Sequence, residues 1–346
     1  MEKLIILDTN SLLYRFYYAL PFFSSHQGLP TNALYGLTNA LIRIINEEQP
    51  DYFIACFDSK VKTFRHQKDI QYKAQRPKAS EDLKIQINLA KKILTAFNVS
   101  ILEKESYEAD DLIGSLVKKY PEKFKVIFSG DLDLLQILDK STILKFFIKG
   151  ILKIEVYDEK KVIEKFNLLP QQLPDFKALV GDPSDNVIGI KGIGKKTASD
   201  LLNKFNNLEN IIKAAEKKLI PLPLRNEILI NKEKLNLNKE LTTIITDLDL
   251  NFELKKYPGL NIDSIIEALK EFDFYSIIER LKKNQISSQK LEEIKFNNNL
   301  PLFLDKIFCL IENEKIYFYD NKNFYVFPIE LQIFEKILSA NEIIIF

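Results

Sequence analysis

The chain has 346 residues, of which 46% are hydrophobic and 28% charged, a composition typical of a globular protein with about two domains. No apolar run of about 18 residues occurs, and Asp8 interrupts the N-terminal stretch MEKLIILDTN, so we expect neither a membrane span nor a secretory signal. Cys56 and Cys309 lack the spacing of a thiolate metal motif, and two histidines are too few for the common histidine motifs. We therefore expect any metal ion to be held through oxygen atoms. We also expect the protein to be a cytoplasmic monomer.

Short apolar runs alternate with helix-period segments through the first half of the chain. The runs expected to form buried strands are residues 4–7, 52–57, 99–102, 126–128 and 143–147. A helix is expected over 81–97, where apolar residues recur at helical spacing. This alternation predicts an α/β fold with a doubly wound, mostly parallel sheet, and residues 151–157 are expected to add a hairpin strand at its edge.

A basic segment lies between the second and third expected strands. The net charge of the chain is only +1, but residues 60–78 contain seven lysines and arginines against one acid, Asp69. Phe64 and Tyr72 are interleaved with these cations. Basic residues mixed with aromatic ones are typical of a surface that binds single-stranded nucleic acid.

Helical patterns replace the strand signals from about residue 160 to 282, and four of the ten glycines fall between 181 and 194. The polar stretch that follows is typical of a linker. Three strand-like runs and a final EIIIF then indicate a short α+β piece that is cut off. The predicted divisions are an α/β core (1–175), a helical subdomain (176–282), a linker (283–299) and a truncated α+β piece (300–346).

Nine acidic residues occupy positions where a parallel sheet gathers its functional groups, just after strands and at the starts of helices. They are Asp8, Asp58, Glu108, Asp110, Asp111, Asp131, Asp133, Asp182 and Asp185. Each alone is explained as a helix cap, but two carboxylates about 4 Å apart repel by roughly 4 kcal/mol at an effective dielectric of 20. Converging acids therefore predict divalent ions, and two Mg²⁺ ions would activate a water and stabilise the leaving oxygen of a phosphodiester.

The glycine-rich stretch GIKGIGKKTA (189–198) favours phosphate contact. It is not a P-loop, because Lys196 stands where the motif needs a hydroxyl, and it lacks the third glycine of a dinucleotide fingerprint. A turn between two helices fits better, with the amides of Gly192 and Gly194 near a phosphate and Thr197 starting the second helix. Lys191, Lys195 and Lys196 would add charge. A plain helix-helix turn with exposed lysines is the alternative.

Six motifs, LDTNSLLYR, FDSKVKTFRH, YKAQRP, SYEADD, SGDLDLLQ and ALVGDPSDNVIGIKGIGKKTA, occur in this order and spacing. Together they resemble the 5′-nuclease domain of bacterial DNA polymerase I, within the flap endonuclease superfamily, over about residues 1–285. The resemblance implies a PIN-like core, a helix-hairpin-helix subdomain and, at 300–346, the start of a 3′-5′ exonuclease-like, RNase H-like domain. The aspartate-x-glutamate pair expected on the first strand of that domain is absent from KIFCLIENE.

The resemblance also implies roles for individual residues. The nine acids would hold two Mg²⁺ ions, for which Mn²⁺ could substitute, and the 189–198 turn would bind duplex backbone with K⁺. Residues 59–80 would form an arch in which Lys73 and Arg76 steady the scissile phosphate and Tyr72 stacks on a base. The remaining DNA contacts would come from Arg15, Arg65, Gly189, Lys191, Gly192, Gly194, Lys195, Lys196 and Thr197.

The expected function is that of a structure-specific 5′-nuclease acting on DNA with a 5′ flap, a nick or a 5′ end, including an RNA primer, in replication and repair. A separate polymerase chain is an expected partner. Three alternatives remain open from the sequence: a non-catalytic module that binds DNA structures, a P-loop nucleotide hydrolase, and an amino-terminal fragment of a DNA polymerase I.

Overall fold

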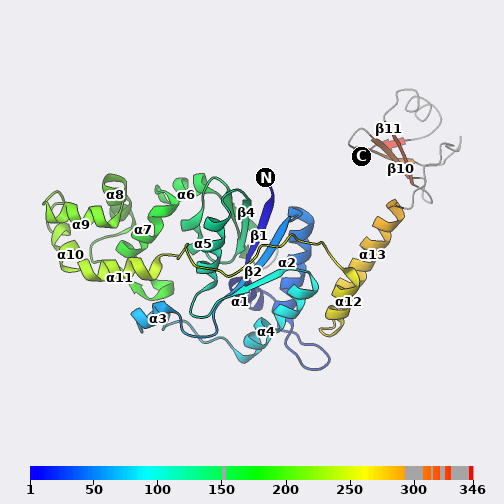
Figure 1. Ribbon diagram of the computed structural model, residues 1–346, viewed down its shortest axis with the longest axis horizontal. Helices are drawn as coiled ribbons and strands as arrows, with labels where there is room; N and C mark the ends of the chain where they lie inside the picture. The colour runs from blue at the N-terminus through cyan, green and yellow to red at the C-terminus, as the bar shows by residue number, and fades with distance from the viewer. Residues whose placement is uncertain (150–152, 293–306, 313–314, 320–323, 329–342, 346) are drawn as a thin grey trace. The chain divides into compact units, whose positions relative to one another are not determined.

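The computed structural model describes residues 1–149, 153–292, 307–312, 315–319, 324–328 and 343–345 (Figure 1). The chain divides into two compact units, Met1–Phe274 and Tyr275–Phe346. Each unit has a larger sheet of its own, and the first also contains a two-stranded hairpin. All nine acids predicted from the sequence belong to the first unit.

The first unit is built around a six-stranded sheet in the order β3-β2-β1-β4-β5-β6. Its strands are β1 (Lys3–Asp8), β2 (Tyr52–Phe57), β3 (Ser100–Glu103), β4 (Phe124–Ser129), β5 (Thr142–Lys149) and β6 (Lys153–Tyr157). All neighbouring pairs are parallel except β5 and β6, which are antiparallel. The doubly wound, mostly parallel sheet predicted from the sequence is confirmed, and the predicted edge strand is β6.

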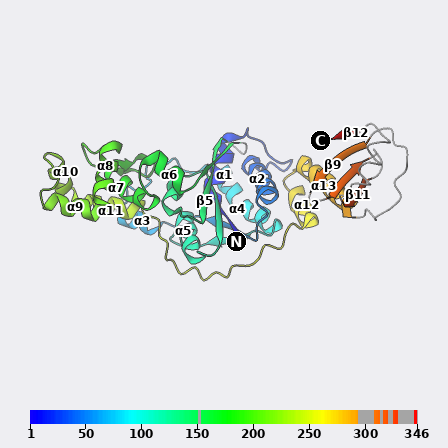
Figure 2. The same ribbon diagram turned by 90° about the horizontal axis from the view of Figure 1, so that it is seen from above.

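Helices cover both faces of this sheet, which is why its central strands β1, β2 and β4 are largely apolar. The helices of this part are α1 (Thr9–Ala19), α2 (Asn32–Glu48), α3 (Phe64–Lys68), α4 (Glu81–Ala96) and α5 (Ala109–Lys119). Leu4 and Ile6 of β1 share a buried cluster with Leu112 and Leu116 of α5. Figure 2 shows α5 on one side of the sheet and α2 and α4 on the other.

The strand order reverses direction between β1 and β4. From β1 the chain winds outward to β2 and β3, and it then returns through α5 to β4 on the other side of β1. Helices on opposite faces diverge at such a reversal, so a crevice forms beyond the carboxyl ends of the two strands. Asp8 ends β1 at this crevice, and Asp131 follows β4 by two residues.

A helical subdomain follows the sheet and has a separate core that includes Leu179, Leu202 and Ile211. Its helices are α6 (Glu159–Phe166), α7 (Leu173–Val180), α8 (Lys195–Phe205), α9 (Leu208–Glu216), α10 (Leu224–Ile230) and α11 (Lys232–Thr242). A short antiparallel hairpin, β7 (Gly181–Asp182) and β8 (Val187–Ile188), separates α7 from the turn before α8. The predicted direct turn between two helices is therefore preceded by a β-hairpin.

Residues 243–261, here called the strap, return from α11 along the core as an extended segment, drawn as a thin trace in Figure 1. The strap is held by hydrogen bonds, among them Leu248 N to Ser115 Oγ (3.2 Å) and Tyr257 N to Asp51 O (2.7 Å). It leads into α12 (Ile262–Lys270), which contacts α4. The helical subdomain is thus attached to the core at both of its ends.

The second unit contains α13 (Tyr275–Glu292) and a four-stranded sheet in the order β11-β10-β9-β12. Its strands are β9 (Ile307–Glu312), β10 (Lys315–Tyr319), β11 (Phe324–Pro328) and β12 (Ile343–Ile345). The predicted linker overlaps α13 up to residue 292, and its remainder, 293–299, lies outside the described residues. The predicted domain boundaries stay predictions. No helix in the described parts of the chain is both long and apolar enough to span a bilayer.

Candidate active site

The acids that follow the strands converge at the crevice between β1 and β4. Ser129 Oγ of β4 donates a hydrogen bond to Asp8 of β1 (2.5 Å), and Ala109 N of α5 donates one to Asp58 after β2 (2.8 Å). Asp8 also caps α1 by accepting from Ser11 N at 3.3 Å. Asp8 is therefore at once the N-cap of α1 and a neighbour of Asp58 and Asp131.

Four of these acids, Asp8, Asp58, Asp110 and Asp131, form no ion pair with any residue in the described part of the chain. Burial and the nearby charge of Asp58 raise the pKa of Asp8 to about 7. Burial and the charge of Asp8 raise the pKa of Asp110 well above its ordinary value. The described residues provide none of these four carboxylates with a cation at contact distance.

A second group, Asp133, Asp182 and Asp185, has carboxylate oxygens that lie within 4.8 Å of one another. Lys177 Nζ bridges Asp133 (2.5 Å) and Asp182 (2.7 Å) in this group. Burial and the charge of Asp131 raise the pKa of Asp133 to about 6, whereas Lys177 outweighs burial and lowers the pKa of Asp182. Clustered carboxylate oxygens are the donor set that hard divalent cations take, so the site fits such an ion.

Two glycines let the β7–β8 hairpin carry Asp182 and Asp185 into this group. Gly181 has φ +91°, which side chains rarely adopt. A Cβ on Gly189 would lie 2.1 Å from the carbonyl oxygen of Val180, so the backbone crosses here at a distance that only glycine allows. In this structure, Gly189 is explained by backbone packing against α7.

The basic segment lies directly over the acids. Lys73 Nζ contacts Glu108 (2.9 Å), and Arg76 Nη2 contacts Asp185 (2.6 Å). Tyr72 is 2% exposed, and its hydroxyl lies 3.2 Å from Glu108 and 3.0 Å from Asp185. The predicted phosphate-binding pair is therefore brought to the site, whereas the ring of Tyr72 is not accessible to a base.

Two other predicted residues are turned inward, and a third is held by backbone carbonyls at the surface. Asp111 is fully buried and forms a two-point ion pair with Arg65, which is itself 2% exposed. Arg15 donates to the carbonyls of Gly130 (2.7 Å) and Ile148 (2.8 Å). The guanidinium of Arg65 is therefore turned away from solvent, whereas Arg15 is only half-buried and its DNA contact stays a prediction. No carboxylate oxygen of Asp111 is free to join the other acids.

The glycine turn before α8 is open to solvent. Lys191, Gly192, Gly194, Lys195 and Lys196 are exposed, and a Cβ on Gly192 or Gly194 would meet no atom within 4 Å. Gly194 is the N-cap of α8, so the helix begins at Lys195, and Thr197 lies in its first turn. This arrangement leaves backbone N–H groups and three ammonium groups available on one surface.

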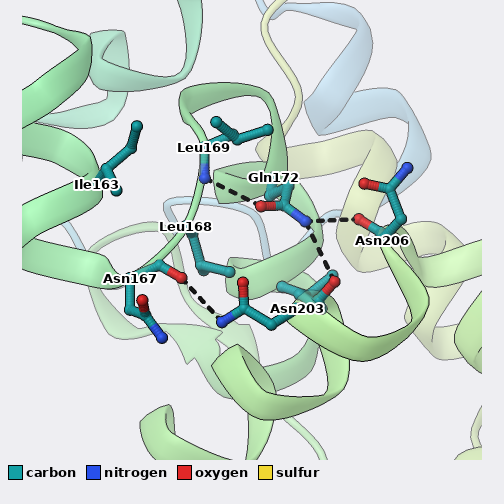
Figure 3. A pocket seen from close by; sticks show the side chains of 8 residues that line it. Ile163, Asn167, Leu168, Leu169, Gln172, Asn203 and Asn206 are labelled. Carbon is teal, nitrogen blue, oxygen red and sulfur yellow. Dashed lines mark hydrogen bonds between the residues drawn. The ribbon is translucent and has the colours of Figure 1, made fainter.

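A cavity of about 300 Å³ lies away from the acids, between α6 and α8 (Figure 3). Gln172 and Asn203 line it, but both use their amide groups to hold backbone atoms. Gln172 donates to Asn206 O (2.8 Å), and Asn203 donates to Asn167 O (3.0 Å). None of the nine predicted acids lines this cavity.

Two residues of the site were missed by the sequence prediction, Lys177 and Ser129. Ser129 ends β4, so the rule that placed acids after strands could have found it. Lys177 is a lone cation in the apolar run FKALV of α7, and that contrast was the only local signal. Such a lysine more often extends into solvent.

The fold of the first unit is shared with known nucleases. The structure of T5 5′-exonuclease with bound zinc superimposes with a TM-score of 0.58 at 20% identity, covering 83% of this chain and 99% of that one. The structural likeness defines the class as the 5′-nuclease fold, an α/β core with a helical subdomain.

Sequence comparison identifies the family. Residues 3–167 match the N-terminal resolvase-like domain of 5′-3′ exonuclease, and residues 168–265 match its C-terminal SAM fold. The chain belongs to the 5′-3′ exonuclease family. It is 40% identical to a 5′-3′ exonuclease of Aquifex aeolicus over 289 residues, which are 82% of this chain and 96% of that protein.

The chain is also similar to longer proteins that are named DNA polymerase I. The chain is 39% identical over 290 residues to DNA polymerase I of Caldicellulosiruptor bescii, covering 82% of this chain. It spans only 34% of the length of that polymerase. The resemblance to the nuclease domain of bacterial DNA polymerase I is confirmed.

Proposed function

We propose that the chain is a structure-specific 5′-nuclease that hydrolyses DNA phosphodiesters with Mg²⁺, or with Mn²⁺ in its place. The observation that supports this most is the gathering of Asp8, Asp58, Asp110 and Asp131 with no ion pair to any described residue. A module that only binds DNA has no need for acids such as Asp8 and Asp110, whose burial and mutual repulsion raise their pKa values. This electrostatic cost speaks against the non-catalytic alternative.

The nine predicted acids divide by environment within this proposal. The uncompensated acids and the group of Asp133, Asp182 and Asp185 would hold the metal ions. Bound divalent ions supply an activated water and a stabilised leaving oxygen in phosphodiester hydrolysis. Lys73 and Arg76, which lie at the rim of the acids, would bind the scissile phosphate and orient it toward them.

Duplex DNA would rest on the exposed turn before α8. Its amides and the ammonium groups of Lys191, Lys195 and Lys196 can bind phosphate oxygens, with K⁺ as a proposed further ligand of the turn. Phosphate contacts fix the register of a duplex and read no sequence. Recognition by structure, at a flap, a nick or a 5′ end, is consistent with such contacts.

The biological proposal is removal of RNA primers and displaced flaps during replication and repair, by a monomer in the cytoplasm. A separate polymerase chain remains the proposed partner. The family match favours the nuclease over the P-loop alternative, whose motif the sequence lacks. A polymerase activity has no support in the matched domains, which are both those of a 5′-3′ exonuclease.

The proposal is tested with a labelled 5′-flap duplex, with and without Mg²⁺. We expect cutting only with the ion, and we expect Asp131→Asn to bind the duplex but to cut on the order of 100-fold more slowly. Asp263→Asn, an exposed aspartate on α12, is the matched control. Undiminished cutting by Asp131→Asn would contradict the metal assignment, and binding without any cutting would favour the non-catalytic module.

A further inference from the structure

Arg65 and Asp111 meet in the interior of the first unit. Arg65 Nη1 and Nη2 each lie 2.7 Å from an oxygen of Asp111, a fork-to-fork pair between α3 and α5. Arg65 is 2% exposed and Asp111 is 0% exposed. Such a pair satisfies both charges without water.

The remaining donors of Arg65 are also occupied. Nε donates to Leu241 O (3.0 Å), and Nη2 donates to Thr243 O (2.8 Å), where α11 ends and the strap begins. Nη1 lies 3.5 Å from Glu108. Four of the five N–H groups of this guanidinium therefore donate hydrogen bonds within the protein, and the side chain is too buried to meet a phosphate.

Asp111 is occupied in the same way. Besides Arg65, its oxygens accept hydrogen bonds from Ile245 N of the strap (2.9 Å) and from Glu108 N (3.2 Å). The bond to Glu108 N is one half of a capping box that starts α5. The direction of the first turn of α5, and with it the placement of Glu108 and Asp110, therefore depends on Asp111.

The charge of Arg65 is maintained despite burial. Desolvation alone would lower the pKa of Arg65, but the hydrogen bonds and charge of Asp111 outweigh it and raise this pKa. Removing one partner would leave a buried charge without a counterion. The two residues are therefore expected to act as a unit.

We propose that Arg65 and Asp111 are positioning residues that join the basic segment, the strap and the first turn of α5, and that Arg65 contacts no DNA and Asp111 no metal ion. This inference rests on the proposed nuclease function. Because Arg65 holds α3 and Asp111 holds the start of α5, the pair fixes Lys73 above Glu108. The acids on α5 are thereby set in place before substrate arrives.

Metal binding distinguishes the positioning role of Asp111 from the metal-binding role proposed for Asp110. Calorimetric titration with Mn²⁺ alone should give Asp111→Asn the stoichiometry of the unaltered protein and an affinity within about threefold of it, whereas Asp110→Asn should bind at least about tenfold more weakly. If Asp111→Asn alone does not fold, the charge-free pair Arg65→Met with Asp111→Asn, whose amide oxygen can still accept from Glu108 N, replaces it in the same titration. Loss of a binding site in either variant would overturn the inference.

The salt dependence of DNA binding distinguishes the positioning role of Arg65 from that of a cation that contacts phosphate. For a phosphate-contacting cation such as Lys195, the alanine variant should reduce the slope of log affinity against log salt by about 0.9. Arg65→Lys should leave this slope unchanged. A reduced slope for Arg65→Lys would show that Arg65 meets phosphate and would refute the proposal.

Turnover provides the third readout, because a misplaced catalytic turn lowers kcat with little change in KM. We expect Arg65→Lys to lower kcat by about 100-fold. Arg65→Met and Asp111→Leu together should lose no more kcat/KM than either alone, since both break one unit. Multiplying effects would show independent roles, whereas an unaltered protein that cuts no flap would refute the nuclease proposal instead.

Discussion

Lys177 places its ammonium group between Asp133 and Asp182, where it cancels part of their repulsion. Burial would lower the pKa of Lys177, but the two carboxylates raise it, so the side chain is charged at neutral pH. The chain therefore carries an internal cation in the acid group that fits a divalent ion. A metal ion entering this group has to compete with Lys177.

This competition gives a prediction at the residue scale. Lys177→Met should bind Mn²⁺ about tenfold more tightly, a difference of about 1.4 kcal/mol, because the ion no longer displaces a cation. In EDTA the same variant should unfold at a lower temperature, since the acids repel without a counterion. Calorimetry and thermal unfolding measure the two effects.

Lys232→Met is the matched control for this experiment, because Lys232 forms an exposed ion pair with Glu216 far from the acids. Exposed pairs contribute about 0–1 kcal/mol, so this variant should behave like the unaltered protein. Equal Mn²⁺ affinity of Lys177→Met and Lys232→Met would show that Lys177 does not compete with the ion.

At the scale of elements, the β7–β8 hairpin joins the helical subdomain to the acids. It carries Asp182 and Asp185, and Lys73 N and Arg76 Nε bond to its residues Asp185 and Ser184. The hairpin thus connects the acid group, the basic segment and α7. Its geometry depends on the close crossing at Gly189.

Gly189→Ala should therefore displace the acids that the β7–β8 hairpin carries. The added Cβ would meet backbone atoms of Val180 and cannot be relieved by a side-chain rotation, so the hairpin has to shift. We expect a loss of about 1–3 kcal/mol in the free energy of unfolding and a lower Mn²⁺ affinity. Urea unfolding and Mn²⁺ titration measure these changes.

Gly194→Ala serves as the control for stability, because it has an ordinary φ of −86° and open space around its Cα. Its unfolding free energy should change by less than about 1 kcal/mol. If Gly189→Ala were as stable as Gly194→Ala and bound Mn²⁺ normally, the close crossing would not be needed to place the acids.

The sequence predicted the elements that local patterns mark, such as the apolar runs of β1 and β2 and the acids that follow them. It did not predict which cation would meet which acid. Arg65 and Asp111 are 46 residues apart, and Lys177 and Asp133 are 44 apart. Such pairs depend on how helices pack, and no spacing in the sequence reports it. Local composition also suggested a linker where α13 continues to Glu292.

At the scale of the whole molecule, the buried acids link stability to pH. Asp8 has an ordinary pKa of 3.8 in the unfolded chain and about 7 in the folded one, so the folded state binds more protons between these values. Stability should therefore fall as the pH rises through this window, by up to about 1.4 kcal/mol per pH unit for one carboxyl. Divalent ions should remove the penalty, because they bind the ionised form.

Urea unfolding in EDTA from about pH 5 to 8, with and without excess Mn²⁺, tests this dependence. Acids with lowered pKa values, such as Asp182, do not affect the measurement in this pH range, because their contribution to stability is lost only at lower pH. Burial lowers the pKa of His66, which acts in the opposite direction, so the comparison is made against Asp8→Asn. Identical pH profiles for Asp8→Asn and the unaltered protein would contradict the assignment.

The strap has a consequence for where a substrate would be cut. A subdomain joined by one connection can swing, but this one is also fastened by residues 243–261 on its return path, so its separation from β1 and β4 is restricted. If the turn before α8 binds the duplex as proposed, the distance between this turn and the acids is fixed. That distance then determines which phosphodiester bond of the substrate is cut. Digestion of a flap should then give one dominant fragment length, independent of base sequence.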